Sequence, residues 1–212
     1  MENVKRIAIF GATGMTGSCA LDVALNFGLK VKLLLRDPAR LPAEYHSKVE
    51  IIQGNVVNIT DVEKTVSEVD GVVIALGTRN NLEPTTEMST GVDNIIAAVK
   101  KTAPAMPVSV CLSSFLFFAP GTVPPVFQHI NAEHERMLKS FEASGLNYIA
   151  VHPPHIADQP KAEYVTKHGE SPGGRIISKH ELGEFLVKCL EMKEHYQKRV
   201  GLCSKSSLPQ CK

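Results

Sequence analysis

Three glycines near the N-terminus lie between an apolar run and an amphipathic one. They are Gly11, Gly14 and Gly17, and the two runs cover residues 7–10 and 19–27. A strand, a glycine-rich turn and a helix in this order form the corner that binds the phosphates of a dinucleotide. Gly11 would permit the tight turn, Gly14 would let the backbone approach a pyrophosphate, and Gly17 would let the helix pack closely on the sheet.

Four further side chains could hold the phosphates and ribose of such a dinucleotide. Thr13 and Thr16 would add hydroxyl donors within the glycine turn. Arg36 ends the second apolar run, where NAD-binding folds usually have an acidic residue for the ribose 2′-hydroxyl. A cation there would pair with a 2′-phosphate, and Arg40 is close enough in sequence to help. This favours NADPH over NADH, with a surface arginine at a strand end as the structural alternative.

Two short segments follow the third and fourth apolar runs, at the edge where open α/β sheets bind ligands. The first segment contains Asn55 and Val56 and would border the adenine. The second contains Leu76, Gly77 and Arg79 and would border the ribose or the nicotinamide phosphate. Asn55 is equally typical of a turn, and Arg79 of a solvated loop.

Ser113 follows the fifth apolar run, where the short-chain dehydrogenase/reductase superfamily usually has its catalytic serine. The glycine spacing G-x-x-G-x-x-G also resembles the extended and atypical branches of that superfamily. Its best-known members need a Tyr-x-x-x-Lys pair as acid and base, but each tyrosine here is followed four residues later by valine or histidine. Carbonyl reduction by that pair is therefore disfavoured. A flavin or a conjugated tetrapyrrole would tolerate its loss, because the ring delocalises the incoming charge.

Histidine, cysteine and aromatic side chains gather around the ends of the fifth and sixth runs. His155 would line the nicotinamide side, or else bond to loop backbone. Its spacing from His152 could suggest a metal, but no further ligand has a recognisable spacing, so we predict no metal site. Phe115 and Phe118 could cover a planar substrate or seal the core, and their place at the ligand edge favours substrate contact. Cys111 is either a reactive thiol or, more commonly, a buried strand residue.

Alternating apolar and amphipathic runs predict the elements that position these residues. Strands are expected at residues 7–10, 31–35, 49–53, 72–76, 108–112, 148–152 and 175–177, and helices at 19–27, 87–101, 129–144 and 178–192, with a loop over 153–174. Such alternation is typical of an α/β protein with a single doubly wound parallel sheet, that is, a Rossmann-like NAD(P)-binding domain. The almost entirely apolar fourth strand should be central, and Ser178 with Glu181 predicts a capping box. We expect the domain to cover residues 1–192 and the Lys/Ser-rich residues 193–212 to form a flexible tail.

Composition narrows the functional classes. The 212 residues are 43% hydrophobic with a net charge of +1, which gives no reason to expect nucleic acid or a membrane as a partner. The N-terminus lacks the apolar core of a signal peptide, and no apolar run reaches the ~20 residues of a membrane helix. The five cysteines are scattered, with no C-x-x-C pair. We therefore expect a cytoplasmic protein.

Several stretches taken together resemble the biliverdin-IXβ reductase family, whose members are also called NADPH-dependent flavin reductases. The stretches are residues 11–17, 34–37, 76–80, 84–86, 113–116, 152–160 and 177–180. The likeness extends from about residue 4 to residue 190 and excludes the predicted tail.

The resemblance implies a monomeric cytosolic enzyme that passes hydride from NADPH to flavins (FMN, FAD, riboflavin) and to biliverdin isomers of the IXβ type. Flavin would be a substrate rather than a tightly bound prosthetic group. The proton would come from solvent, in agreement with the missing Tyr-x-x-x-Lys pair. The resemblance implies that Ser113 and His155 lie at the reacting end. It further implies contacts to cofactor or substrate from Met88, Phe115, Phe118, His134, Ile156 and Arg175.

Three positions depart from the family. The family has aspartate at Asn55, arginine at Val126 and tryptophan at Phe118, so preference among substrates does not carry over. A non-enzymatic NADP(H)-binding redox sensor that acts on a protein partner is an alternative that also fits the missing acid-base pair. A nucleotide-sugar or isomerase-type enzyme is less suited, because such chains usually carry a larger C-terminal substrate region.

Overall fold

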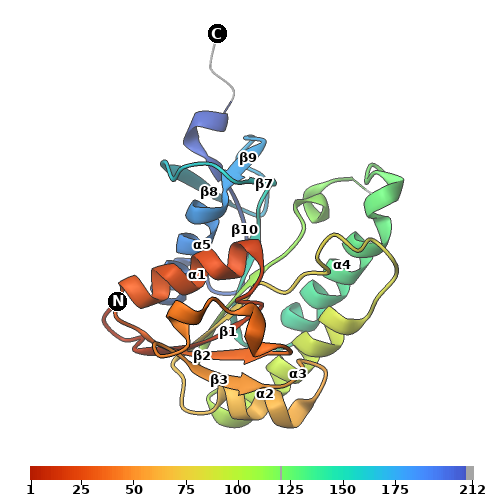
Figure 1. Cartoon of the computed structure of the whole chain (residues 1–212). Coiled ribbons are helices and arrows are strands. Elements are labelled where there is room, and N and C mark those ends of the chain that lie inside the picture. The colour runs from red at the N-terminus through yellow and green to blue at the C-terminus, as the bar shows by residue number, and fades with distance from the viewer. Residues whose placement is uncertain (120, 209–212) are drawn as a thin grey trace.

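The computed structural model, which describes residues 1–119 and 121–208, has one large sheet with helices on both faces (Figure 1). The order of its strands is β3-β2-β1-β4-β5-β6-β10-β8, and every neighbouring pair is parallel except β10 with β8. The bounds are Arg6–Phe10 (β1), Lys30–Leu35 (β2), Glu50–Gln53 (β3), Gly71–Ile74 (β4), Pro107–Cys111 (β5), Asn147–His152 (β6), Tyr164–His168 (β8) and Lys198–Ser204 (β10). The doubly wound parallel fold is thus confirmed, with β4 in the middle of the sheet.

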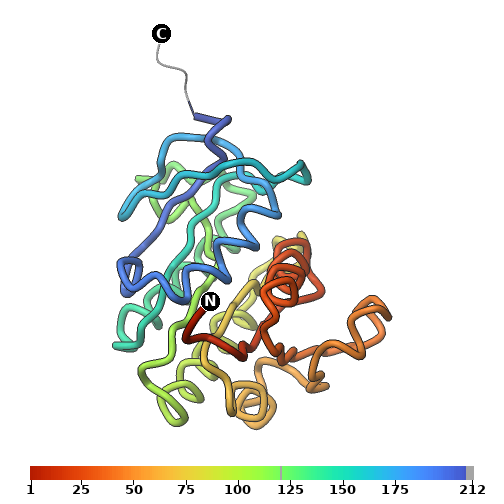
Figure 2. The backbone as a smooth tube through the Cα atoms, turned by 90° about the vertical axis from the view of Figure 1, so that its left-hand side faces the viewer, coloured from red at the N-terminus to blue at the C-terminus, as the bar shows by residue number. Residues whose placement is uncertain are grey.

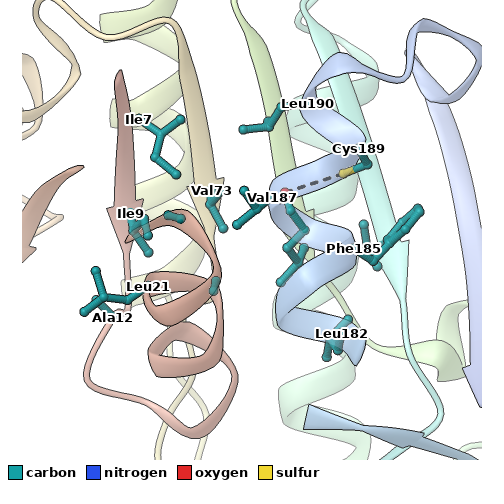
Figure 3. Packing of buried hydrophobic residues seen from close by; sticks show 14 of the residues in the cluster. Ile7, Ile9, Ala12, Leu21, Val73, Leu182, Phe185, Val187, Cys189 and Leu190 are labelled. Carbon is teal, nitrogen blue, oxygen red and sulfur yellow. Dashed lines mark hydrogen bonds between the residues drawn. The ribbon is translucent and has the colours of Figure 1, made fainter. Parts of the chain in front are cut away.

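Alternation along the strands divides the apolar side chains between two cores. The helices are α1 (Met15–Asn26), α2 (Ile59–Val66), α3 (Glu87–Thr102), α4 (Gln128–Glu142) and α5 (Lys179–Lys188). Ile7 and Ile9 of β1 belong to the core under α1 and α5, part of which Figure 3 shows. Ala8 and Phe10 belong to the core under α2, α3 and α4. Successive residues of one strand face opposite sides of the sheet, so both cores are built on the same strands.

The strand order reverses between β1 and β4. The chain runs outward from β1 through β2 to β3, then crosses back to β4 and continues outward in the other direction. The connections after β1 and β4 therefore leave on opposite faces, and a crevice opens at the carboxyl ends of these two strands. This is the place in the sheet where a ligand site is expected.

The irregular stretch after β6 contains more structure than its sequence predicts. Residues His155–Ala157 (β7) pair with Ile176–Ser178 (β9) in a separate two-stranded parallel sheet, so the seventh predicted strand lies outside the main sheet. Strand β8 falls within the predicted loop, and α2 was also not predicted. The capping box at the start of α5 is confirmed, because Ser178 and Glu181 make both of its hydrogen bonds.

The expectation of a flexible tail from residue 193 is wrong for the part of it that the structure describes. Strand β10 lies between β6 and β8, where Figure 2 shows the dark blue chain running back along the sheet. Val200 and Leu202 are fully buried in the core under α5. The burial of β10 comes from the strands on both sides of it, and the local sequence does not show which strands those are. Residues 209–212 of the predicted tail lie outside the described residues.

Among the helices of residues 1–119 and 121–208, none combines the length and the apolar composition that crossing a bilayer would require.

Candidate functional site

A cavity of about 1040 Å³ opens at the crevice and borders the carboxyl ends of β1 to β6. It contains nearly all of the residues that the sequence singled out. Those lining it are Gly11, Thr13, Gly14, Thr16, Arg36, Arg40, Asn55, Val56, Leu76, Gly77, Arg79, Met88, Ser113, Phe115, His134, His155 and Ile156. Residues from six separate connections of the fold thus meet in one space.

Three predicted residues are not in the lining. Gly17 lies behind the turn, where an added Cβ would be 2.1 Å from the carbonyl oxygen of Gly11, so its role is close packing, as expected. Phe118 packs against Phe115, which is part of the lining, with ring centroids 5.3 Å apart and the rings perpendicular. Arg175 is exposed, and its carbonyl oxygen accepts a hydrogen bond from the backbone N–H of His155 at 3.2 Å. The expected substrate contacts of Phe118 and Arg175 therefore stay predictions.

The glycine corner leaves the first turn of α1 open to the cavity. Gly14 is the N-cap of α1, and no side chain of the described residues caps this helix. Gly11 has a φ of +90°, and a Cβ added to it would lie 2.3 Å from the carbonyl oxygen of Ala75. The free N–H groups at such a helix end attract anions. The corner therefore suits a pyrophosphate, in agreement with the sequence.

Two of the predicted cofactor residues already have partners within the protein. The Arg36 guanidinium faces Glu87, with Nη1 and Oε1 3.5 Å apart. The side chain of Asn55 accepts a hydrogen bond from the backbone N–H of Val57 at 3.3 Å. The backbone N–H of Asn55 donates to the carboxylate of Asp61 at 3.0 Å. Asn55 thus forms the turn that was its alternative interpretation, while also lining the cavity.

Ser113 is fixed by the buried residue His152. The Nδ1 atom of His152 donates to the carbonyl oxygen of Ser113 at 2.8 Å, and the imidazole packs on Phe117 with centroids 4.5 Å apart. Burial lowers the pKa of His152 to about 4, so the ring is neutral near pH 7 and Nδ1 carries its hydrogen. The Ser113 hydroxyl oxygen accepts from the backbone N–H of Phe115 at 3.1 Å. His152, considered in the sequence only as a metal ligand, is a positioning residue for Ser113.

The cavity wall offers little acid at neutral pH. Burial lowers the pKa of His134 to about 4, so this ring is also neutral, and its Nδ1 has no hydrogen-bond partner among the described residues. Burial raises the pKa of the Cys111 thiol to about 12, which favours the inert interpretation of this cysteine. No tyrosine or lysine is among the described residues that line the cavity. In the same residues, no three His, Cys, Asp or Glu side chains are grouped in a way that could hold a metal ion.

Two of the wall residues that sequence reasoning missed bear on the chemistry of the site. Phe127 lines the cavity and stacks on Phe115, with centroids 5.4 Å apart and an interplanar angle of 29°. Glu87 lines it beside Arg36. The sequence does show that Phe127 follows a Pro-Pro pair, which excludes a regular strand or helix interior there. The partner of Glu87 depends on a contact between residues 51 positions apart and has no local signal.

The lowered pKa values of His134 and His152 should make stability depend on pH. A group whose pKa is lower in the folded chain takes up its proton more readily when unfolded, so stability falls as the pH drops from about 6.5 towards 4. A pKa lowered from 6.5 to about 4 corresponds to a loss of up to about 3 kcal/mol for each of these histidines once the pH has reached 4. Urea unfolding between pH 7 and pH 5, where most carboxyl groups stay ionised, should show the decline. His134→Gln should flatten this dependence, whereas His129→Gln, at an exposed position of the same helix, should leave it unchanged. An equal slope in all three proteins would contradict this assignment.

Comparison with known proteins agrees with the fold and shows the family. The model of a family described as NAD(P)H-binding matches residues 11–193. A Rossmann-fold NAD(P)-binding family protein from Shigella flexneri is 20% identical with a TM-score of 0.78, covering 99% of this chain and 98% of its own. A wide-type short-chain dehydrogenase/reductase from Veillonella parvula in complex with NADP is 16% identical with a TM-score of 0.78, covering 98% and 100%. ChuY, an anaerobillin reductase from Escherichia coli O157:H7, is 14% identical with a TM-score of 0.81, covering 97% and 100%.

Proposed function

Because the chain belongs to the NAD(P)H-binding family, we propose that it is an NADPH-dependent reductase that transfers hydride to flavins and to biliverdins of the IXβ type. The flavin (FMN, FAD or riboflavin) is a substrate that enters and leaves. The observation that carries the proposal is that one continuous cavity joins the uncapped end of α1 and Arg36 to Ser113, Phe115 and His155. One end suits a dinucleotide with a 2′-phosphate, and the other carries the stacked rings of Phe115 and Phe127.

The proposed class of hydride acceptor follows from the side chains that line the cavity. Bound NADPH would supply the hydride, and the wall holds no Tyr-Lys pair among its described residues, while the imidazole of His134 is neutral and cannot protonate an alkoxide. A planar conjugated acceptor needs no such group, because its ring spreads the incoming charge and water can protonate it later. The stacked pair Phe115 and Phe127 offers a face for such a ring.

The protein's part in the reaction is therefore mainly orientation. His152 fixes the loop that carries Ser113, so the hydroxyl of Ser113 is held at the reacting end of the cavity. Neutral His134 and exposed His155 border the same end and can hydrogen-bond to polar edges of a substrate. Holding two reactants in a reactive geometry lowers the barrier without a protein acid.

The proposal is tested by anaerobic NADPH oxidation with FMN, riboflavin or biliverdin IXβ as acceptor. We expect turnover with at least one acceptor well above the rate in free solution. Gly14→Val, which adds bulk where the pyrophosphate must approach, should abolish this turnover while the protein stays folded. If the wild-type protein binds NADPH but reduces none of the acceptors, the reductase proposal fails and a non-enzymatic redox sensor becomes the better interpretation.

A further inference from the structure

An acidic side chain lies where the cofactor's 2′-phosphate would bind. Glu87 belongs to the first turn of α3, Arg36 follows the last residue of β2, and both line the cavity. Their Oε1 and Nη1 atoms are 3.5 Å apart, and their side chains are 55% and 53% exposed. The pair is thus open to a ligand that enters the cavity, and Glu87 is the only acidic partner of Arg36 among the described residues.

Contacts with α4 hold Glu87 in this place. The backbone N–H of Glu87 donates to the hydroxyl oxygen of Thr85 at 3.1 Å, and Arg136 donates to the carbonyl oxygen of Thr85 at 2.7 Å. Fully buried Glu133 accepts from the backbone N–H of Ser89 at 2.7 Å and from its hydroxyl at 3.0 Å. The residues on both sides of Glu87 are therefore tied to α4, so its carboxylate is not on a freely moving loop.

A carboxylate at this point acts on the two dinucleotides in opposite directions. It offsets the charge of Arg36 and repels a 2′-phosphate, both of which weaken binding of NADP(H). It can also accept a hydrogen bond from a ribose 2′-hydroxyl, which is the contact that acidic residues make in NAD-binding folds. Arg36 therefore favours the 2′-phosphate of NADP(H), whereas the adjacent Glu87 favours the 2′-hydroxyl of NAD(H).

We propose that Glu87 is a specificity-determining residue that narrows the preference for NADP(H) over NAD(H) by competing with the 2′-phosphate for Arg36. The inference rests on the proposed role of Arg36 in binding that phosphate. It explains why the cation at the end of β2 carries a counter-ion, and it assigns the chain the ability to use both dinucleotides.

The test is calorimetric titration of NADP⁺ and NAD⁺ into the wild-type protein and the variants Glu87→Gln and Glu83→Gln. Glu83 is exposed and does not line the cavity, so Glu83→Gln removes the same charge at a position four residues before Glu87. Glu87→Gln should tighten NADP⁺ binding by about three- to tenfold, the scale of an exposed charge pair plus direct repulsion, and should leave NAD⁺ binding equal or weaker. Glu83→Gln should leave the ratio of the two affinities unchanged. An unchanged ratio in Glu87→Gln, or an equal change in both variants, would overturn the proposal.

Arg36→Ala separates this inference from the proposed function. Loss of NADP⁺ affinity in Arg36→Ala together with no effect of Glu87→Gln would refute the role of Glu87 alone and leave the phosphate contact in place. An unchanged affinity ratio in Arg36→Ala would instead refute the phosphate contact itself. In the double variant, the gain from Glu87→Gln should shrink, because no cation remains to be released. A gain of full size in the double variant would show that Glu87 does not act by competing for Arg36.

Discussion

Replacing Gly11 with alanine is expected to lower the free energy of unfolding by about 3 kcal/mol or more and to abolish dinucleotide binding. The residue has a φ of +90°, which a residue with a Cβ adopts only under strain. The added Cβ would also lie 2.3 Å from the backbone carbonyl oxygen of Ala75, at the end of the central strand β4. A backbone atom cannot turn aside as a flexible side chain can, so the turn after β1 must move. Urea unfolding and NADP⁺ titration measure the two effects.

Gly77 provides the matched control for Gly11. It lines the same cavity, but an alanine Cβ there meets nothing within 4 Å and its φ is not positive. The free energy of unfolding of Gly77→Ala should therefore lie within about 0.5 kcal/mol of that of the wild-type protein. Gly11→Ala as stable as Gly77→Ala would show that the turn tolerates a side chain and that the glycine is not required.

Glu133→Ala should destabilise the protein by about 3–5 kcal/mol, the usual cost of removing one member of a buried charged network. Its carboxylate is fully buried and accepts hydrogen bonds from the backbone and hydroxyl of Ser89 and from the Nε of Arg136. Removing the carboxylate leaves all of these donors without an acceptor, and two of them are at the start of α3. Because this helix start positions Met88 in the cavity wall, cofactor affinity should fall as well. Chemical unfolding and NADP⁺ titration are the measurements.

Glu135→Ala controls for the same substitution elsewhere on α4. Glu135 is exposed and pairs with Lys139 one turn later at 2.7 Å, a contact worth about 0.5 kcal/mol or less. A loss of stability in Glu133→Ala no larger than that in Glu135→Ala would mean that the buried network does not stabilise the site.

The sequence predicted the fold and most of the cavity because both depend on local patterns. The glycines of the first turn, the apolar strands and the residues that follow each strand can all be recognised within a few positions. Parallel strands bring their carboxyl ends to one edge, so residues as distant as Thr13, Asn55 and Ser113 could be assigned to one site before any contact was known. His134 could be placed there only through the family resemblance, since it lies in the middle of α4.

The features that the sequence did not predict depend on contacts across the chain. Strand β10 owes its burial to β6 and β8, and its Lys- and Ser-rich flanks obscure buried apolar positions such as Val200 and Leu202. The pairing of Arg36 with Glu87 and the capping of Ser89 by Glu133 join residues 51 and 44 positions apart. No periodicity indicates such pairs, although they decide how the cavity is charged and how firmly one wall is held.

Because no side chain within residues 1–119 and 121–208 caps the N-terminus of α1, the stability of the folded protein should depend on the concentration of its ligand. A dinucleotide whose phosphates complete this helix end binds the folded chain and not the unfolded one, so it shifts the folding equilibrium by mass action. At a concentration one hundred times the dissociation constant, the shift is about 2.7 kcal/mol. A cell rich in the dinucleotide would then hold almost no unfolded copies for its proteases to degrade. In a cell with little of the dinucleotide, more copies would be unfolded and degraded, so the amount of the protein would fall with the dinucleotide concentration.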